Sequence, residues 1–274
     1  MNKGLSAQDC SIVLHIRCNF SKFAALFFCM RRFFGYLLTP IFYFCFAVAL
    51  LIFHPIQWLC LKLGGYTAHK RSVDILNFFL TSCNYTLFNS VQFTGHEKLP
   101  IGVPIIFVAN HQSMFDIPAI IYHLRKHHAK FISKIELAHA GIPSISFNLL
   151  HGGAANIDRK DPKQSIAEIL KLANNMKQKN WSAVIFPEGT RTKTGKMKNF
   201  SVGGIATLLK KNPNALVVPI AINGSYQMVQ YGMFPLRPFT KMTWEVLAPI
   251  DKEGLNAEEI VKQAEDLIRS KVEH

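Results

Sequence analysis

A histidine and an aspartate, His111 and Asp116, lie five residues apart where a predicted buried strand (104–110) runs into a predicted helix (116–126). In α/β proteins, functional sites are placed at the sheet edge where strands end. Histidine transfers protons near neutral pH, and a carboxylate bonded to its second ring nitrogen fixes the tautomer and stabilises the imidazolium. The pair therefore predicts general-base chemistry, with His111 as the base and Asp116 as the group that orients it.

The same spacing occurs at His69 and Asp74, which follow an apolar run and have no predicted strand before them. We interpret this second pair as structural or lipid-facing. Ser113 lies two residues from His111 and stays open as a nucleophile, although the sequence has no GxSxG elbow. A base that activates the hydroxyl of an acceptor needs no enzyme nucleophile when the donor is already activated, as a thioester is.

A second polar block, from Phe186 to Arg191 (Phe-Pro-Glu-Gly-Thr-Arg), follows another predicted strand (182–186). Gly189 permits close backbone approach, Thr190 offers a hydroxyl, and the guanidinium of Arg191 can hold a phosphate with two hydrogen bonds. These residue types suit a phosphorylated substrate.

Two members of this block leave alternatives open. Glu188 could order Arg191, accept a hydrogen bond from a substrate hydroxyl, or hold the loop in shape. For Arg191, the residues alone favour a structural ion pair over contact with a ligand, and both remain open at this point.

Basic residues at other predicted strand ends could extend such a site. Lys134 begins a Lys-Ile-Glu-Leu segment, and Arg159 follows the predicted strand 153–157. They could form a cationic rim, but pairing of Arg159 with Asp158 or Asp161 is the simpler interpretation. Three lysines after the second block would either attract anions or belong to a solvated loop: Lys193, Lys196 and Lys198.

Short apolar runs alternate with amphipathic stretches from about residue 100 onward. Besides the strand and helix around His111, the pattern predicts strands at 129–133, 153–157, 182–186, 216–222 and 242–248. It predicts helices at 162–179, 201–211 and 257–272, together with a helix that is broken near Pro143. This alternation is typical of an α/β fold, a sheet with helices on its faces.

Two prolines carry positional information. Pro162 stands at the first position of a predicted helix, where its missing N–H costs nothing, and Asp161 before it is a favoured capping residue. Pro219 interrupts the predicted strand 216–222 and cannot donate to a ladder, so we expect either an edge position or a bend that lines the site.

A run of 29 residues, 33–61, contains no Asp, Glu, Lys or Arg and exceeds the ~20 residues that span a bilayer. Pro40 and Pro55 lie inside it, and each tends to break or bend a helix. Basic residues flank both ends, which the positive-inside rule places on the cytoplasmic side: Arg31 and Arg32 before the run, Lys62, Lys70 and Arg71 after it. We favour a re-entrant or monotopic hairpin over a single span, which stays as the alternative.

The composition sets the broad class. The chain has 274 residues, of which 49% are hydrophobic, and a net charge of +14. Such an apolar chain folds, and basicity combined with this much hydrocarbon favours anionic lipid over nucleic acid as the partner. We predict two parts, a basic and membrane-embedded segment (1–75) and a globular domain (76–274).

All six cysteines precede residue 84 and lack paired metal spacing. A disulfide scaffold, a zinc ribbon and a cysteine nucleophile are therefore not expected in the globular part. We expect no metal site.

Four segments, in this order and each at a predicted strand end, resemble the four blocks of the glycerolipid acyltransferase family. They are NHQSMFD (110–116), KIEL (134–137) with IDR (157–159), FPEGTR (186–191) and VVPIAI (217–222). The resemblance covers about residues 95–230 and is greatest to the 1-acyl-sn-glycerol-3-phosphate acyltransferases. Ser201 stands where the family commonly has a lysine, which weakens statements about how the head group is held.

The resemblance implies an α/β domain behind an amino-terminal membrane-embedded helical motif. From the basic residues that flank the apolar run, we expect the domain on the cytoplasmic face. It implies transfer of an acyl chain from acyl-CoA or acyl carrier protein, with no cofactor, to the sn-2 hydroxyl of lysophosphatidic acid, which gives phosphatidic acid. His111 and Asp116 would be catalytic. The substrate-binding residues that it implies are Glu188, Gly189, Thr190 and Arg191, helped by Lys134 and Arg159.

Alternatives remain for the acceptor and for the class of protein. Glycerol-3-phosphate, a lysophospholipid with a larger head group and a lyso-aminolipid are acceptors of related enzymes. A non-catalytic membrane-surface protein that binds anionic lipid is the alternative from another class.

Overall fold

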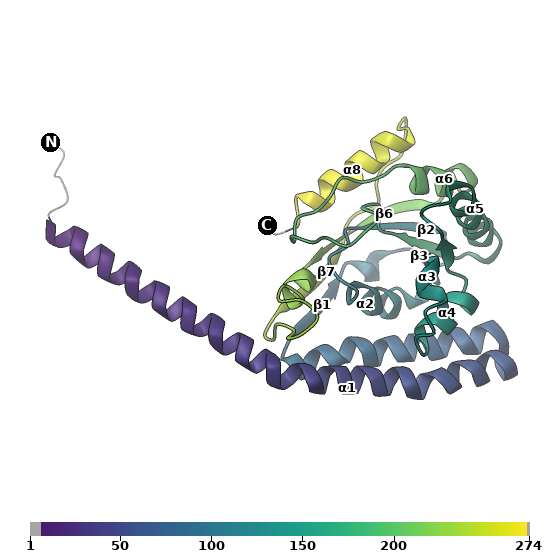
Figure 1. Cartoon of the computed structure of the whole chain (residues 1–274). Helices are drawn as coiled ribbons and strands as arrows, with labels where there is room; N and C mark the ends of the chain where they lie inside the picture. The colour runs from purple at the N-terminus through teal and green to yellow at the C-terminus, as the bar shows by residue number, and fades with distance from the viewer. Residues whose placement is uncertain (1–6, 273–274) are drawn as a thin grey trace.

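The computed structural model describes the backbone of residues 7–272 and the side chains of residues 28–272. Its strands are β1 (Ser90–Thr94), β2 (Ile105–Ala109), β3 (Ala129–Lys134), β4 (Ala155–Ile157), β5 (Ser182–Ile185), β6 (Leu216–Asn223) and β7 (Lys241–Val246). They form one seven-stranded sheet in the order β1-β7-β6-β2-β5-β3-β4 (Figure 1). Neighbouring strands are parallel except β6 and β7, which are antiparallel. The predicted α/β class is confirmed.

Helices cover both faces of the sheet (Figure 1). One face carries α5 (Pro162–Lys179), α6 (Gly203–Lys211) and α8 (Ala257–Arg269). The other carries α2 (Asp116–His123), α3 (Ile135–Ala138), α4 (Ile145–His151) and, outside them, the long helix α1 (Ala7–Ser82). A single helical turn, α7 (Ser225–Met228), follows β6. The result is a sheet between two helical layers, with α1 as a further layer on one side.

The central strand β2 is buried along its whole length, as expected for a parallel strand covered on both faces. Phe107 and Ala109 belong to the core that faces α1 and α2, whereas Ile106 and Val108 face α5, α6 and α8. This alternation follows from the two-residue period of a strand. Burial on both faces holds β2 in place in the sheet. His111 lies two residues after the end of this strand.

Helix α5 begins where the sequence predicts. The Asp161 carboxylate accepts hydrogen bonds from the backbone N–H groups of Lys163 (2.9 Å) and Gln164 (3.1 Å). Pro162 occupies the first helical position. The cap and the proline together define this helix start, because they satisfy or remove donors that have no partner inside the helix.

Helix α1 is a hairpin of two antiparallel arms (Figure 1). The helix is interrupted at Gly65, with φ 63° and ψ −158°, a conformation that residues with a Cβ rarely adopt. The rings of Phe53 and Phe79, one from each arm, lie 5.8 Å apart. Pro40 and Pro55 lie inside continuous helix. A helical hairpin is therefore present, and its placement in a membrane stays a prediction. The helix continues through both prolines, so the expectation of a break at them is wrong. The second arm reaches Ser82, so residue 75, the predicted limit of the first segment, falls within it.

The inner face of α1 packs on the start of α2. The ring of Phe115 lies 5.3 Å from Phe42 and 6.1 Å from Phe46, edge to face in both cases. Leu76 and Leu80 of the second arm join the same core cluster. The hairpin thus supports the turn that carries His111 and Asp116.

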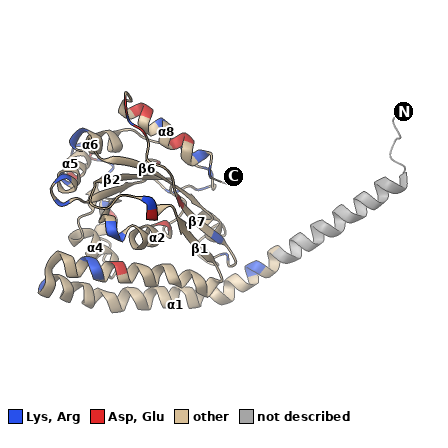
Figure 2. Cartoon of the chain, turned by 180° about the vertical axis from the view of Figure 1, so that it is seen from behind, with Lys and Arg blue, Asp and Glu red and all other residues tan. Residues whose placement is uncertain are grey.

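The outer face of α1 is apolar and exposed. Within the described residues one helix, Phe28–Leu87, is long and apolar enough to cross a membrane, and only 17% of its most apolar stretch is buried. A core helix of a globular protein would be mostly buried. Figure 2 shows few charged residues along both arms. Large exposed side chains on this face include Leu37, Ile41, Phe44, Leu51, Ile52 and Leu63.

Several predictions need correction. Strand β6 lies between β7 and β2, so the edge position expected from Pro219 is wrong. The ladder between β6 and β7 begins one residue later, at the pair Ile220–Val246, so no N–H of residue 219 is needed for it.

Helix α2 ends at His123, and the chain continues as a tight turn at Arg125–His127. Strand β1 and the turn α7 were not predicted.

Candidate active site

The predicted contact between His111 and Asp116 forms. The Nδ1 atom of His111 lies 2.8 Å from Oδ2 of Asp116, whose side chain is completely buried. The His111 side chain is 14% exposed. No hydrogen bond to its Nε2 occurs among the side chains described, residues 28–272. The nitrogen suited to take a proton is therefore the one left without a partner.

Asp116 is held by more than the histidine. Its Oδ2 also accepts hydrogen bonds from the backbone N–H groups of Gln112 (2.8 Å) and Ser113 (3.0 Å), and its Oδ1 accepts one from the hydroxyl of Ser225. Burying a carboxylate is costly unless its oxygens find donors. Four donors meet this need and fix the carboxylate plane, which in turn fixes the imidazole.

Sequence reasoning missed Ser225. It follows β6 at the same edge of the sheet as His111, three residues after the fourth block. The intervening Gly224 has φ 82°, and a Cβ there would overlap the backbone oxygen of Lys241. The glycine is thus required for the turn that brings the hydroxyl to Asp116. One signal in the sequence could have identified Ser225: it carries a hydroxyl and lies three residues after the end of the predicted strand 216–222.

Asn110 ties the catalytic turn to β6. Its Nδ2 donates to the backbone oxygen of Ile222 (2.9 Å), and its Oδ1 accepts from the backbone N–H of Ile222 (2.7 Å). The backbone N–H of Tyr226 donates to the side-chain oxygen of Gln112 (3.2 Å). These contacts join residues more than 100 positions apart and make the site rigid before any substrate binds.

Glu188 braces the two blocks against each other. Its Oε1 accepts the backbone N–H of His111 (2.8 Å), and its Oε2 accepts that of Lys198 (2.9 Å). Burial raises the pKa of Glu188, and these two hydrogen bonds act in the opposite direction. Of the three alternatives for this residue, the geometry matches the one in which it holds the loop. The neighbouring Phe186 stacks on the His111 ring at 4.1 Å.

The loop after Glu188 presents cations to a cleft. The Nζ atom of Lys198 donates to Thr190 Oγ1 (2.6 Å) and to the backbone oxygen of Arg191 (3.1 Å). Arg191 and Lys193 are exposed. Among the described side chains no carboxylate forms an ion pair with Arg191, so the structural ion pair favoured by the residues alone is absent. Gly189 has φ 71° and open space around it.

The cleft beside the pair has a volume of about 330 Å³ and two unlike walls. One wall is polar and cationic, with Arg191 and Lys193. The other is apolar, with Met114, Val229 and Met233. The remaining lining residues are Gln112, Ser113, Thr190 and Thr192. Such a cleft suits an amphiphile that has an anionic head and an apolar body.

Ser113 contributes to the turn instead of facing His111. Its hydroxyl accepts the backbone N–H of Phe115 (3.1 Å), and the residue is 2% exposed. In the described part of the chain, no hydrogen bond joins this hydroxyl to the imidazole. This arrangement gives no support to a nucleophilic role.

Lys134 and Arg159 lie at neighbouring strand ends, because Lys134 pairs with Ile157 in the β3–β4 ladder. Lys134 forms an exposed ion pair with Glu136 (2.8 Å). The pairing expected for Arg159 is wrong: Asp158 accepts the backbone N–H of Lys160, and Asp161 caps α5. Neither Lys134 nor Arg159 lines the cleft.

The second histidine–aspartate pair does not form. His69 is completely buried with both ring nitrogens unpartnered, and it contacts the ring of Phe147 in α4. Asp74 instead pairs with Lys70. The structural interpretation of this pair is confirmed.

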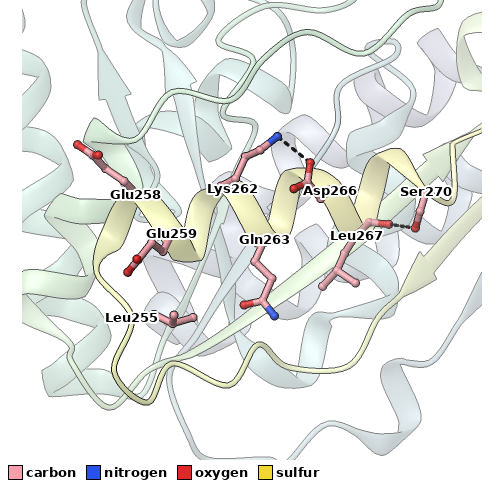
Figure 3. A pocket seen from close by; sticks show the side chains of 8 residues that line it. All are labelled: Leu255, Glu258, Glu259, Lys262, Gln263, Asp266, Leu267 and Ser270. Atoms are coloured by element: carbon pink, nitrogen blue, oxygen red, sulfur yellow. Dashed lines mark hydrogen bonds and ion pairs between the residues drawn. The ribbon is translucent and has the colours of Figure 1, made fainter.

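A larger hollow, of about 790 Å³, lies on the outer side of α8 (Figure 3). Three of its polar side chains are engaged locally: Lys262 and Asp266 form an ion pair, and Ser270 donates a hydrogen bond to the backbone oxygen of Leu267. α8 packs on the face of the sheet opposite to α1 and α2. This hollow is therefore separate from the His111 cleft.

Comparisons with known proteins show similarity to acyltransferases. The family model named Acyltransferase matches residues 90–223. The chain is 33% identical over 146 residues to a chloroplastic 1-acyl-sn-glycerol-3-phosphate acyltransferase of Arabidopsis thaliana, covering 53% of this chain and 39% of the relative. It is 30% identical over 192 residues to the alpha form from Ovis aries, covering 69% and 64%. The chain thus spans less than two thirds of these relatives.

A solved structure shares the fold over most of both chains. The crystal structure of the 1-acyl-sn-glycerophosphate (LPA) acyltransferase PlsC from Thermotoga maritima superposes with a TM-score of 0.72 at 25% identity, covering 88% of this chain and 95% of that chain. The sheet, the buried His111–Asp116 pair and the family match define residues 90–223 as an acyltransferase domain. Residues 90–223 match the Acyltransferase family model, and the chain is similar to proteins named 1-acyl-sn-glycerol-3-phosphate acyltransferases.

Proposed function

We propose that the protein transfers an acyl chain from a thioester donor, acyl-CoA or acyl carrier protein, to the sn-2 hydroxyl of a 1-acylglycerol-3-phosphate. The product is phosphatidic acid. The observation that carries the proposal is the position of His111. Its Nδ1 contacts buried Asp116, its Nε2 has no hydrogen-bond partner among the described side chains, and a cleft with one cationic and one apolar wall lies beside it.

Nε2 of His111 takes the proton of the acceptor hydroxyl while the oxygen attacks the thioester carbon. The tetrahedral intermediate then collapses, the carbon–sulfur bond breaks, and the thiolate leaves. The proton on Nε2 passes to the thiolate, so His111 ends the cycle neutral. Asp116 stabilises the imidazolium in between, and no covalent bond to the enzyme is required.

The walls of the cleft assign the two ends of the acceptor. Arg191 and Lys193 lie where they can bind the phosphate, and the planar guanidinium can do so with two hydrogen bonds. Gly189 and Thr190 shape the loop that presents them, and Glu188 anchors it. Met114, Val229 and Met233 would lie along the glycerol and acyl chain. Lys134 and Arg159 would add to the attraction for anionic substrates from the neighbouring strand ends.

The outer face of α1 would lie in the bilayer as a hairpin, with the domain on the cytoplasmic side. Its exposed apolar face and the basic residues at both ends of the apolar run support this placement. A membrane-bound enzyme would then meet its lipid acceptor without extracting it into water.

The test is thiol release by the full-length protein in vesicles, with acyl-CoA or acyl carrier protein as donor. The acceptor panel would hold 1-acylglycerol-3-phosphate, glycerol-3-phosphate, a lysophospholipid with a larger head group and a lyso-aminolipid. We expect release that depends on 1-acylglycerol-3-phosphate and yields phosphatidic acid. Preference for another acceptor would replace the proposed substrate, and no release with any acceptor would refute the enzymatic function.

A further inference from the structure

The segment between α7 and β7, residues 229–240, runs from the cleft to α1. Val229 and Met233 line the cleft beside Met114. The backbone oxygen of Met233 then accepts a hydrogen bond from the Tyr43 hydroxyl (2.7 Å). We call these residues the cleft–hairpin segment. It is attached to the catalytic cleft at one end and to the apolar helix along its length.

The attachment to α1 is close and specific. The backbone N–H of Leu236 donates to Thr39 Oγ1 (2.9 Å), whose own hydroxyl donates to the backbone oxygen of Gly35 (2.6 Å). A Cβ on Gly35 would lie 2.6 Å from the backbone oxygen of Leu236, so only glycine allows this approach. The segment therefore has a fixed position on the first arm of α1.

Its outward side is aromatic and exposed. Phe234 is 54% exposed and lies 5.6 Å from the ring of Tyr36. Phe239 is 40% exposed and contacts the rings of Phe34 (6.0 Å) and Phe88 (5.6 Å). These contacts join the exposed rings of the segment to those of α1, and the result is one continuous apolar surface.

A bilayer is the partner that this surface fits. Contiguous exposed apolar patches mark interaction sites, whereas single exposed apolar residues do not. The surface continues the apolar face of α1, and basic residues border it: the guanidinium of Arg32 lies 5.8 Å from the ring of Tyr231. Residues 224–244 contain no Asp or Glu. Aromatic rings with basic neighbours are typical of the interface between a membrane and water.

We propose that the cleft–hairpin segment is a second membrane contact, along which the acyl chain of the lipid acceptor passes between the bilayer and the cleft. Met233 is the point of transfer, because it lines the cleft and is also 45% exposed. The role in substrate passage rests on the proposed function. The segment lies beyond residue 223, where the family match ends.

The first test measures membrane contact without activity. In the full-length protein, Phe234→Trp places a new indole on the segment, and Leu255→Trp places one on an exposed site near α8 as the matched control. In vesicles of anionic phospholipid with brominated chains, we expect fluorescence quenching to increase over the parent protein for Phe234→Trp alone. Equal quenching of both variants, or none for Phe234→Trp, would overturn the membrane contact.

The second test measures passage of the acceptor. The double variant Phe234→Ser, Phe239→Ser leaves the cleft lining intact. The control Leu255→Ser, Leu267→Ser removes two exposed leucines, one just before α8 and one within it. With a long-chain acceptor in vesicles, we expect the rate of the first variant to fall roughly tenfold. With a short-chain, water-soluble acceptor its rate stays at that of the parent.

An unchanged rate in vesicles, or an equal loss on both acceptors, would overturn the passage role. If the parent acylates neither acceptor, the proposed function fails. The quenching result would still decide the membrane contact, so the two failures are distinguishable.

Discussion

Two histidine–aspartate pairs with the same spacing lie in very different regions of this molecule. His111 and Asp116 flank the turn between β2 and α2, where the backbone folds back and brings Nδ1 and Oδ2 to 2.8 Å. His69 and Asp74 lie on one continuous helix, where five residues correspond to nearly one and a half turns and the side chains leave on different faces. Asp74 therefore pairs with Lys70, one turn away. The five-residue spacing alone therefore does not predict a histidine–aspartate contact. The conformation of the backbone between the two residues decides whether their side chains meet.

The largest expected effect comes from removing the base. We expect His111→Ala to lower the rate of acyl transfer by about 10³-fold or more, within the usual contribution of a general base and its positioning. His69→Leu replaces an imidazole whose ring nitrogens have no hydrogen-bond partner among the described residues. The acyl-transfer rate of this variant should therefore stay within about twofold of the parent rate. Thiol release from acyl-CoA measures both. Similar losses of acyl-transfer rate in the two variants would contradict the difference between the two histidine–aspartate pairs.

The next effect comes from the aspartates. Asp116→Asn removes the charge that stabilises the imidazolium, so we expect kcat to fall by about 10²-fold while the acceptor KM changes little. Asp74→Asn alters an ion pair with Lys70 that is largely buried and does not line the cleft, so we expect it to affect stability more than kcat. Steady-state kinetics in vesicles check both variants. A loss of activity in Asp74→Asn that equals the loss in Asp116→Asn would contradict the assignment.

The first pair has a cationic cleft beside it, and Arg191 tests what that cleft contributes. We expect Arg191→Ala to raise the KM for the phosphorylated acceptor roughly tenfold, because a hydrogen bond to a charged group is lost, with a smaller change in kcat. Lys134→Ala should raise it less, since Lys134 already pairs with Glu136 and lies outside the cleft. An unchanged acceptor KM in Arg191→Ala would exclude phosphate contact.

Substitution of Ser225 tests whether its hydroxyl helps to hold Asp116 in place. We expect Ser225→Ala to lower kcat roughly fivefold, because a buried carboxylate oxygen loses its donor and the imidazole is positioned less firmly. Ser225→Thr should restore part of the rate, and Ser270→Ala, which removes an exposed hydroxyl from the end of α8, is the control. A Ser225→Ala variant with a normal kcat and pH profile would remove Ser225 from the positioning residues.

The smallest effect concerns His123, a histidine that belongs to neither pair. Burial lowers the pKa of His123 to about 4, and the charges of His96 and Arg125 contribute. The unfolded chain therefore binds a proton near pH 6.5 that the folded chain binds only near pH 4, so stability falls as the pH drops through this window. In detergent, Tm should decrease between pH 7 and pH 5, and less in His123→Phe. An equal decrease in both proteins would rule out His123 as the source.

The sequence predicts the parts of the site that lie within one strand-to-helix turn. His111, Asp116 and Arg191 all follow buried strands, and strand ends converge at one edge of an α/β sheet. Ser225 was missed because its contact with Asp116 spans 109 positions, and no local pattern encodes such a contact. Glu188 left three alternatives open for the same reason, since its partners lie in two other segments.

The hairpin shows a second limit of prediction from the sequence. Pro40 and Pro55 drew attention as helix breakers, yet the helix continues through both because packing of its inner face on the domain outweighs the local cost. The turn occurs at Gly65, where a Gly-Gly pair permits a positive φ. That dipeptide was the better local signal for a reversal.

The most direct test of the central claim is a double-mutant cycle on the pair. If Asp116 acts only through His111, then the variant with both His111→Ala and Asp116→Asn should be no slower than His111→Ala alone. The measurement is the acylation rate of 1-acylglycerol-3-phosphate in vesicles for the parent, the two single variants and the double variant. The account predicts equal rates for His111→Ala and the double variant. Losses that multiply would contradict it, because they would show that the two residues act independently.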